Sequence, residues 1–405
     1  MVKISKLVVY GALAAISARY VDYQALFTWG VWSATILLGS NDRCYLRNPF
    51  LMSLFSSLEK RDLRRDEEIP ATPPVIIEAK DYSFRALELL SQHWTQPVIV
   101  RGLFADAPAL SKWTSPDYLA QTFLNSSVSV IHNGTIVKHY EMVCAEEEQG
   151  EATFSEYKPF VETLRRIASE GSTETIVYPP ASRSKRIRDK EVEERWNEMV
   201  KNDVNLKTVG GGIFDDGARS TVLTQMFLGG SAAPSKTEAV PAIGTGWHGD
   251  ICNNFVVQVS GVKQWVMVDP KYSHLMRPTM RGGKTAIVGG HLSIEQDTLP
   301  YFPHHEFLLH PGDMLYNPEW YWHSIRNLPG GPYAFGLISR QCHIQRNFKQ
   351  ASAFTSMVVA NHVWAAIFDV EARMRLYSAI TGASLMKPEK GVNVDAQNEV
   401  RGGYT

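Results

Sequence analysis

The most constraining feature of this 405-residue chain is a pair of possible metal ligands, His248 and Asp250, separated by one residue. They lie in a glycine-containing stretch that leads into two apolar runs, 255–260 and 262–268, typical of strands. Side chains two positions apart on an extended strand point to the same face. A histidine and a carboxylate on one face can supply two ligands of a facial triad, which suits non-haem Fe(II) because coordination positions stay open.

The best candidate for the third ligand is His323. It follows a Pro-Gly-Asp turn at 311–313 and a short predicted strand, and it ends an aromatic run at 320–322. Aromatic side chains at the mouth of a barrel can form a metal pocket. Two simpler interpretations remain open, since a His-X-Asp triplet arises by chance and a histidine in an aromatic cluster can be structural.

Lys263 is a second indication of a ligand site. Strand alternation places Lys263, Trp265 and Met267 on one face and mostly apolar residues on the other. This pattern predicts a strand covered on both sides, where a lysine is costly unless an anion pairs with it. A dicarboxylic co-substrate would supply that anion. The alternative is a lysine that extends from the neighbouring turn into water.

Composition narrows the class of protein. The chain is 44% hydrophobic, enough for a large core, and its net charge of −1 gives no basic field. We therefore expect no nucleic-acid partner. A basic run at 183–188 is followed at once by acidic residues, which favours a solvated helix face, and residues 170–220 are otherwise weakly patterned. The four cysteines are too far apart for a zinc knuckle and indicate no particular pairing.

Residues 1–40 are unusually apolar. Two lysines precede an apolar run at 7–18, which is too short to span a bilayer and fits the core of a signal peptide. We expect entry into the secretory pathway, to the lumen of the endoplasmic reticulum or Golgi, with membrane association through this segment. Glycosylation sequons at Asn125 and Asn133 agree with that location. A retained anchor, an organellar transit segment and a cytoplasmic helix pair are the alternatives.

Further along, the spacing of residues matches a known family. Residues 97–340 resemble the JmjC and cupin-like Fe(II)/2-oxoglutarate oxygenases, and are most similar to the asparaginyl hydroxylase (factor-inhibiting-HIF-like) branch. The family has a Thr three residues before its first metal His, here Thr245, and an Asn four residues after its metal Asp, here Asn254. Its co-substrate Lys follows the first His by fifteen residues, here Lys263. Its second His ends a Gly-Asp-X-Leu-Tyr-X-Pro-X-X-Trp-Trp-His run, here residues 312–323 with Tyr321 in place of one Trp.

The resemblance implies both fold and chemistry. The fold would be mainly β with helical flanks, around a double-stranded β-helix (jelly-roll or cupin) core. His248, Asp250 and His323 would hold Fe(II), and 2-oxoglutarate would bind beside them. Three further residues would bind this co-substrate: Thr245, Asn254 and Lys263. Oxygen would then hydroxylate a C–H bond, with release of succinate and CO2. A protein side chain is the expected substrate, and a small molecule or lipid is the alternative.

The chain also departs from the family pattern. Members often carry an Asn on the strand after the second metal His, and the corresponding segment here, 334–340, has none. The apolar N-terminus is absent from nuclear and cytosolic members. Two other functions therefore stay open: a non-catalytic cupin that binds a ligand or partner, and a JmjC N-methyl-lysine demethylase, although no histone-reader module or basic tail is visible.

These observations predict four segments. Residues 1–40 form the signal or membrane anchor, and 41–78 form a linker that ends in prolines. Residues 79–345 form the cupin-like oxygenase domain. Residues 346–405 form a helical extension with a polar tail.

Overall fold

The computed structural model places most of the central part of the chain. The N-terminal segment 1–40, the sequons at Asn125 and Asn133, and the extension from 347 onward lie outside the described residues. The described residues are 66–124, 126–132, 156–168, 174–178, 190–214, 223–230, 244–273, 275–276, 287–289, 298–329, 331–341 and the isolated positions 53, 56, 59, 60, 63 and 346.

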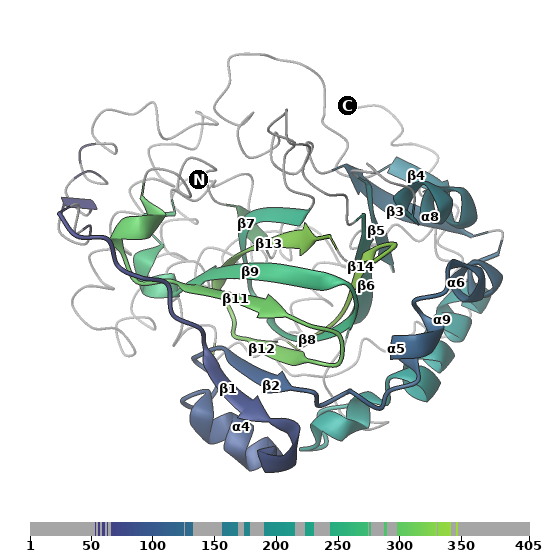
Figure 1. Ribbon diagram of the computed structural model, residues 1–405, viewed down its shortest axis with the longest axis horizontal. Helices are drawn as coiled ribbons and strands as arrows, with labels where there is room; N and C mark the ends of the chain where they lie inside the picture. The colour runs from purple at the N-terminus through teal and green to yellow at the C-terminus, as the bar shows by residue number, and fades with distance from the viewer. Residues whose placement is uncertain are drawn as a thin grey trace, which may run out of the picture.

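Two β-sheets form the centre of the molecule (Figure 1). The larger sheet has the order β1-β2-β12-β8-β14-β6-β5-β3-β4, and the smaller has the order β10-β7-β13-β9-β11. The larger sheet consists of β1 (Val75–Glu78), β2 (Val98–Arg101), β12 (Met314–Asn317), β8 (Asn253–Ser260), β14 (Ala334–Gln341), β6 (Leu223–Gly229), β5 (Glu174–Tyr178), β3 (Ser127–His132) and β4 (Glu156–Pro159). The smaller consists of β10 (Ile287–Gly289), β7 (Gly244–Asp250), β13 (Trp322–Leu328), β9 (Val262–Val268) and β11 (His305–Leu309).

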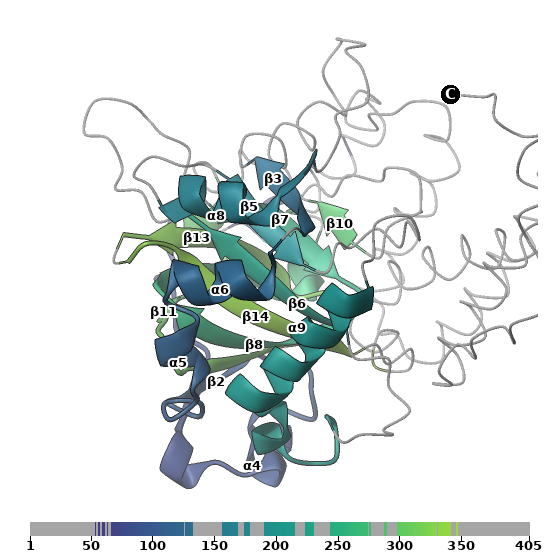
Figure 2. The ribbon, with the colours of Figure 1, turned by 90° about the vertical axis from the view of Figure 1, so that its right-hand side faces the viewer.

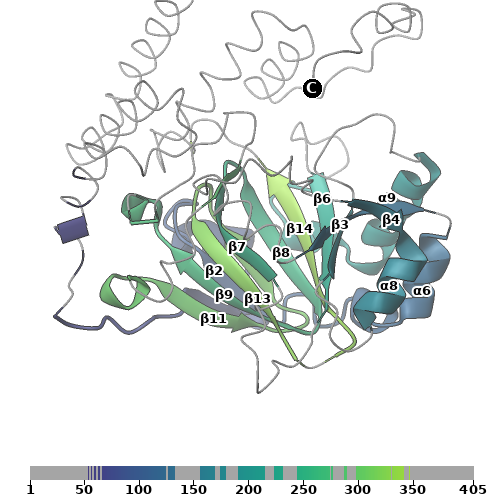
Figure 3. The same ribbon diagram turned by 90° about the horizontal axis from the view of Figure 1, so that it is seen from above.

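The two sheets, which Figure 3 shows from above, share a buried layer of apolar side chains. The larger sheet contributes Ile99, Val256, Leu315 and Ile338, and the smaller contributes Trp265, Met267, Phe307, Leu309 and Ile325. Burying each of these side chains stabilises the fold by about 1.5–3 kcal/mol relative to exposure. The predicted fold, mainly β with helical flanks around a jelly-roll core, is confirmed.

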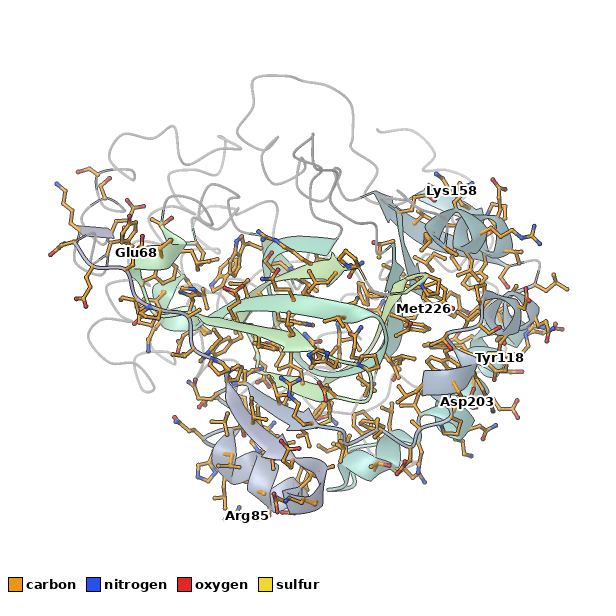
Figure 4. The ribbon with its side chains drawn as sticks, in the orientation of Figure 1. Glu68, Arg85, Tyr118, Lys158, Asp203 and Met226 are labelled. Atoms are coloured by element: carbon orange, nitrogen blue, oxygen red, sulfur yellow. The ribbon has the colours of Figure 1, made fainter. Side chains whose placement is uncertain are left out.

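Helices cover the outer face of the larger sheet (Figure 2). They are α5 (Ala109–Lys112), α6 (Pro116–Thr122), α8 (Phe160–Ala168) and α9 (Lys190–Asp203), while α4 (Phe84–Leu90) lies beside β1 and β2. Ser115 caps α6 by accepting a hydrogen bond from the backbone of Tyr118, with proline at the first turn, as the sequence predicts. Outward-pointing side chains such as Met226 of β6 are fully buried under this layer (Figure 4).

Asp203 joins three of these helices. Its buried carboxylate at the end of α9 accepts hydrogen bonds from Lys112 Nζ (2.7 Å), Trp113 Nε1 (2.8 Å) and Tyr118 Oη (2.6 Å). Figure 4 shows Tyr118 and Asp203 close together on this side of the molecule. Three donors around one carboxylate fix the positions of α5, α6 and α9 relative to each other, because removing the acceptor leaves the buried Trp113 donor and the partly buried Tyr118 hydroxyl unpaired.

Two turns predicted from the sequence position the strands that carry the candidate site. Gly261, with φ of +64°, joins β8 to β9 in a conformation that favours glycine. In the Pro-Gly-Asp turn before β12, the Asp313 carboxylate pairs with Arg101 and accepts from the Gly102 backbone at 3.0 Å. These contacts attach the start of β12 to the end of β2.

The sheet begins earlier than the sequence suggested. β1 starts at Val75, inside the segment expected to be a linker, and pairs in parallel with β2. Among the described residues, no helix is long and apolar enough to cross a membrane. Cys252, just before β8, forms a disulfide, although the sequence indicated no pairing.

Candidate metal centre

Neighbouring strands bring the two histidines together. β13 pairs antiparallel with β7, and His323 lies directly opposite His248, with ring centroids 4.1 Å apart. Asp250 ends β7 two residues later, on the same face as His248. One ligand atom from each of His248, Asp250 and His323 can be chosen so that all three lie within 4.8 Å of one another. The structure thus places side by side the three residues that the sequence predicted as ligands.

Backbone carbonyls orient both imidazoles. His248 Nδ1 lies 2.8 Å from the Gly246 carbonyl oxygen, and His323 Nδ1 lies 2.9 Å from that of Tyr321. A carbonyl only accepts, so in each ring Nδ1 carries the proton and Nε2 keeps its lone pair for a metal. Outer hydrogen bonds of this kind fix the tautomer and orientation of metal-binding histidines.

The Asp250 carboxylate is engaged on one side only. Its Oδ2 accepts from Asn254 Nδ2 at 3.0 Å and lies 3.6 Å from Arg340 Nη2. Its Oδ1 is buried and has no hydrogen-bond partner among the described residues. Burial opposes ionisation, but electrostatic interaction with Arg340 and with the two imidazoles, together with the Asn254 hydrogen bond, outweighs it, so the Asp250 pKa is lowered. A buried, ionised oxygen without a donor is suited to a metal ion.

His323 is deeply buried, and its environment favours the neutral form. Burial and then the neighbouring His248 lower the pKa of His323 to about 3. Its ring stacks on Trp265 with centroids 5.5 Å apart. Asn317 brings its amide within 3.4 Å of His323 Nδ1. Because that nitrogen carries the proton, the amide oxygen and not the nitrogen should face it.

A β-bulge brings Thr245 to the inner face. His323 pairs with His248 but Ile325 pairs with Thr245, so two residues of β13 span three residues of β7. Ile325 belongs to the buried layer, and a residue directly opposite lies on the same face. Gly244 precedes Thr245 on β7, and a Cβ added at Gly244 would collide with the Ile325 carbonyl. Thr245 Oγ1 is buried without a hydrogen-bond partner among the described residues.

Lys263 lies deeper between the sheets and does not reach water. It is 6% exposed, pairs with Asn327 of β13, and donates from Nζ to the Phe227 carbonyl at 3.3 Å. Asn327 is four residues beyond His323, so Lys263 starts roughly 13 Å along the strand from the metal ligands. Burial lowers the pKa of Lys263 to about 8, and no charged group among the described residues contributes to that shift. The ammonium lacks the anion that the sequence analysis required.

Sequence reasoning missed other polar groups on the inner faces. Thr175, Gln258 and Asn327 each have a buried oxygen without a hydrogen-bond partner among the described residues. Gln258 donates to the carbonyls of Ser260 (2.7 Å) and Gly261 (3.0 Å), which leaves its Oε1 as a free acceptor. Arg340 was also missed as a site residue. A polar residue at an inward position of an apolar strand was the available signal for Gln258.

These residues fit a divalent transition metal. Two imidazole nitrogens and one carboxylate oxygen on adjacent strand positions make up the donor set of non-haem Fe(II) sites, which leave positions open. Each donor atom is free of competing hydrogen bonds among the described residues, and each ligand has a partner that holds it in place.

Comparison with known proteins places this geometry in context. A sequence model of the cupin-like domain matches residues 88–354, well over half of the chain. The matched range contains β2, every strand of the smaller sheet and all three candidate ligands. A search of curated proteins gave no match.

Proposed function

Since this chain belongs to the cupin-like family, we propose that it is a Fe(II)- and 2-oxoglutarate-dependent oxygenase that hydroxylates a C–H bond. One observation carries the proposal: the His248, Asp250 and His323 donor set shares the inward face of the smaller sheet with a buried lysine, Lys263, that has no counter-ion in the described part of the chain. A metal site alone is common to many cupins. The buried Lys263 ammonium beyond the metal ligands, hydrogen-bonded to the Phe227 carbonyl but facing no carboxylate among the described residues, favours an anionic ligand that would reach from the metal into the barrel.

The order of residues along the sheet fits a dicarboxylate. The metal ligands occupy one level, Thr245 lies opposite Ile325 at the next, and Lys263 lies opposite Asn327 beyond it. One end of 2-oxoglutarate would bind the metal, and its far carboxylate would accept from Lys263 Nζ and Thr245 Oγ1. That arrangement gives the Thr245 hydroxyl a hydrogen-bond partner and gives the Lys263 ammonium an anion, which neither has among the described residues.

The overall reaction would convert 2-oxoglutarate, O2 and a C–H group into succinate, CO2 and a C–OH group. Bound iron would supply dioxygen activation, while the electrons that reduce O2 would come from 2-oxoglutarate and the C–H group. The chain itself supplies a neutral His323 and an ionised Asp250, each favoured by its surroundings, and a Lys263 whose pKa of about 8 keeps it cationic at neutral pH despite its burial. The apolar layer between the sheets excludes water from the region around Trp265 and Ile325.

The substrate proposed is a protein side chain, because the residues around the metal are most similar to the asparaginyl hydroxylase branch. Asn254, expected to bind the co-substrate, hydrogen-bonds to Asp250 and Arg340 in this structure, and its contact with 2-oxoglutarate stays a prediction. The larger sheet presents Ile338 and Arg340 where family members often carry the Asn that holds the co-substrate.

We place the enzyme in the secretory pathway, a proposal supported by the apolar segment 1–40 and by the disulfide at Cys252, since disulfides persist in oxidising compartments. The full-length chain can be expressed with microsomes and treated with protease and endoglycosidase. Protection and a glycosidase shift are expected. Digestion in intact vesicles without a glycosidase shift would refute the lumenal location.

The activity test needs no known substrate. The full-length chain, loaded with Fe(II) under anaerobic conditions, is given 2-oxoglutarate and then air, and succinate is measured. We expect slow succinate release that requires iron and is absent from Asp250→Ala. Tight metal binding with no consumption of 2-oxoglutarate, even with extracts as a source of substrate, would instead favour a non-catalytic cupin.

A further inference from the structure

Arg340 reaches from the larger sheet toward the metal ligands on the smaller one. It lies near the end of β14, and only 16% of its side chain is exposed. Its Nε donates to Asn254 Oδ1 at 3.1 Å, and its Nη2 lies 3.6 Å from Asp250 Oδ2. The guanidinium also lies over the Phe227 ring, 6.0 Å from its centroid. Arg340 therefore contacts Asn254, which hydrogen-bonds to the candidate ligand Asp250, and it faces no carboxylate other than that of Asp250 among the described residues.

This contact fixes the orientation of the Asn254 amide. The two ends of an asparagine amide are usually assigned only from their hydrogen bonds. Arginine can only donate, so the end of Asn254 that faces Arg340 must be the oxygen. The NH2 group then necessarily faces Asp250, where it donates to Oδ2 at 3.0 Å.

The two carboxylate oxygens of Asp250 therefore have different surroundings. Oδ2 is hydrogen-bonded by Asn254 and faces the positive charge of Arg340, whereas Oδ1 has no donor among the described residues. We propose that Arg340 is a positioning residue that acts through Asn254 to hold Asp250 so that Oδ1 alone faces the metal. One-oxygen binding leaves one more coordination position for the co-substrate and O2 than two-oxygen binding would.

Strand pairing explains why this arrangement depends on arginine. Arg340 lies opposite Asn254 in the β14–β8 ladder, and Asn254 follows Asp250 by four residues. A lysine could keep the charge but could not supply the planar pair of donors that reaches Asn254 and Asp250 together. Arg340→Lys therefore separates positioning from charge. Arg340→Met removes both, and it also removes a positive charge that repels the metal ion.

The inference rests on the proposed metal centre, so its test measures binding and spectra. Co(II) is titrated into the full-length wild-type chain and into Arg340→Lys, Asn254→Ala and the double variant. We expect Arg340→Lys to weaken Co(II) binding about 10–100-fold, as is typical when an outer partner of a metal ligand is lost. Its visible Co(II) spectrum should also change, because the carboxylate binding mode changes. The double variant should lose less affinity than the sum of the two single losses, since Arg340 and Asn254 both act on Asp250 Oδ2.

Arg101→Lys is the matched control. It changes another arginine that pairs with a carboxylate, that of Asp313, away from the candidate ligands. It should leave the affinity and spectrum for Co(II) unchanged. Thermal unfolding of the metal-free variants checks that Arg340→Lys still folds.

Two results would overturn the inference. If wild type binds Co(II) and Arg340→Lys binds it with the same affinity and spectrum, Arg340 does not position Asp250. If Arg340→Lys changes only the requirement for 2-oxoglutarate, Arg340 is an anion-binding residue instead. A wild-type chain that binds no metal refutes the proposed function itself, which is a distinct outcome.

Discussion

Replacing Lys263 with methionine should stabilise the co-substrate-free protein while removing its response to 2-oxoglutarate. Methionine has a similar length and no charge. Lys263 is 6% exposed, and its ammonium donates to one carbonyl oxygen in the structure, that of Phe227. The residue is therefore costly to the fold and should be useful only when an anion binds.

The magnitude follows from the pKa of Lys263. Burial lowers that pKa from 10.5 to about 8, which corresponds to a cost of about 3 kcal/mol for keeping the side chain charged at neutral pH. Loss of the hydrogen bond to the Phe227 carbonyl offsets about 1 kcal/mol of the stabilisation that follows from removing the buried charge. We expect Lys263→Met to raise the free energy of unfolding by about 2 kcal/mol, which raises the unfolding temperature by a few degrees.

Binding should change in the opposite direction. Loss of the buried cation should raise the 2-oxoglutarate requirement on the order of a hundredfold or more, while Fe(II) affinity stays close to wild type. Lys271→Met is the matched control, because its side chain is 63% exposed and pairs with Asp269 at 3.6 Å. Lys271→Met should change neither the 2-oxoglutarate requirement nor the Fe(II) affinity.

The pH dependence has a defined sign. Lys263 is charged below a pKa of about 8 in the folded chain, so the apparent affinity for 2-oxoglutarate should fall as the pH rises past 8. Between about pH 8 and 10.5 the unfolded chain retains a proton that folded Lys263 has lost, so stability without co-substrate should rise with pH relative to Lys263→Met. The measurements are thermal unfolding and titration by tryptophan fluorescence. A Lys263→Met chain that is less stable than wild type, or that keeps its 2-oxoglutarate response, would refute this reasoning.

Three further predictions concern other parts of the molecule. Thr245→Val should raise the 2-oxoglutarate requirement about tenfold without loss of stability in thermal unfolding, because its buried hydroxyl has no partner to lose; an unchanged requirement would exclude it from the site. Asp203→Asn should lower the free energy of unfolding by about 1–3 kcal/mol. Since the Asp203 pKa is lowered, this difference from wild type should shrink as the pH falls below 4. Equal urea midpoints for the two proteins at pH 7 would contradict this prediction. Peptide mapping without reduction should find Cys252 in a disulfide. We expect Cys342 as its partner, because Gln341 pairs with Asn253 and the same antiparallel register continued by one residue would bring position 342 opposite Cys252. A linkage to Cys44 or Cys144 would show the register argument to be wrong.

The candidate ligands could be predicted because their signal is local. His248 and Asp250 share a face through strand alternation alone, and the same alternation placed Lys263 inside the barrel, where the structure has it. Glycine and proline turns fixed the limits of β8, β9 and β12 closely. In these segments one pattern specified both the strand and the direction of its side chains.

Other residues depend on features that alternation cannot reveal. Thr245 is three residues before His248, so a regular strand would point it away from the metal, and only the bulge in β7 brings it inward. Its inclusion came from family resemblance. Arg340 and Asn254 meet because β14 pairs with β8 across more than eighty residues, a register that no local pattern encodes.

The weakly patterned region between 170 and 220 contained more structure than expected. It holds β5 and α9, and α9 buries Val192, Trp196, Met199 and Val200 at helical spacing. Charged residues between these positions hid the apolar stripe. The sequence did not predict β13 as a strand. Its inward residues include the polar His323 and Asn327, which interrupt the alternation of apolar and polar residues by which a strand is recognised.

The central claim is that His248, Asp250 and His323 bind a single metal ion, and equilibrium dialysis tests it most directly. The full-length chain and the Asp250→Ala variant are dialysed anaerobically against Fe(II), and bound iron is measured with thermal unfolding as a check on folding. Wild type should bind one iron per chain, and Asp250→Ala should bind none at the same free concentration while remaining folded. Equal iron binding by the two chains would contradict the assignment of the metal centre.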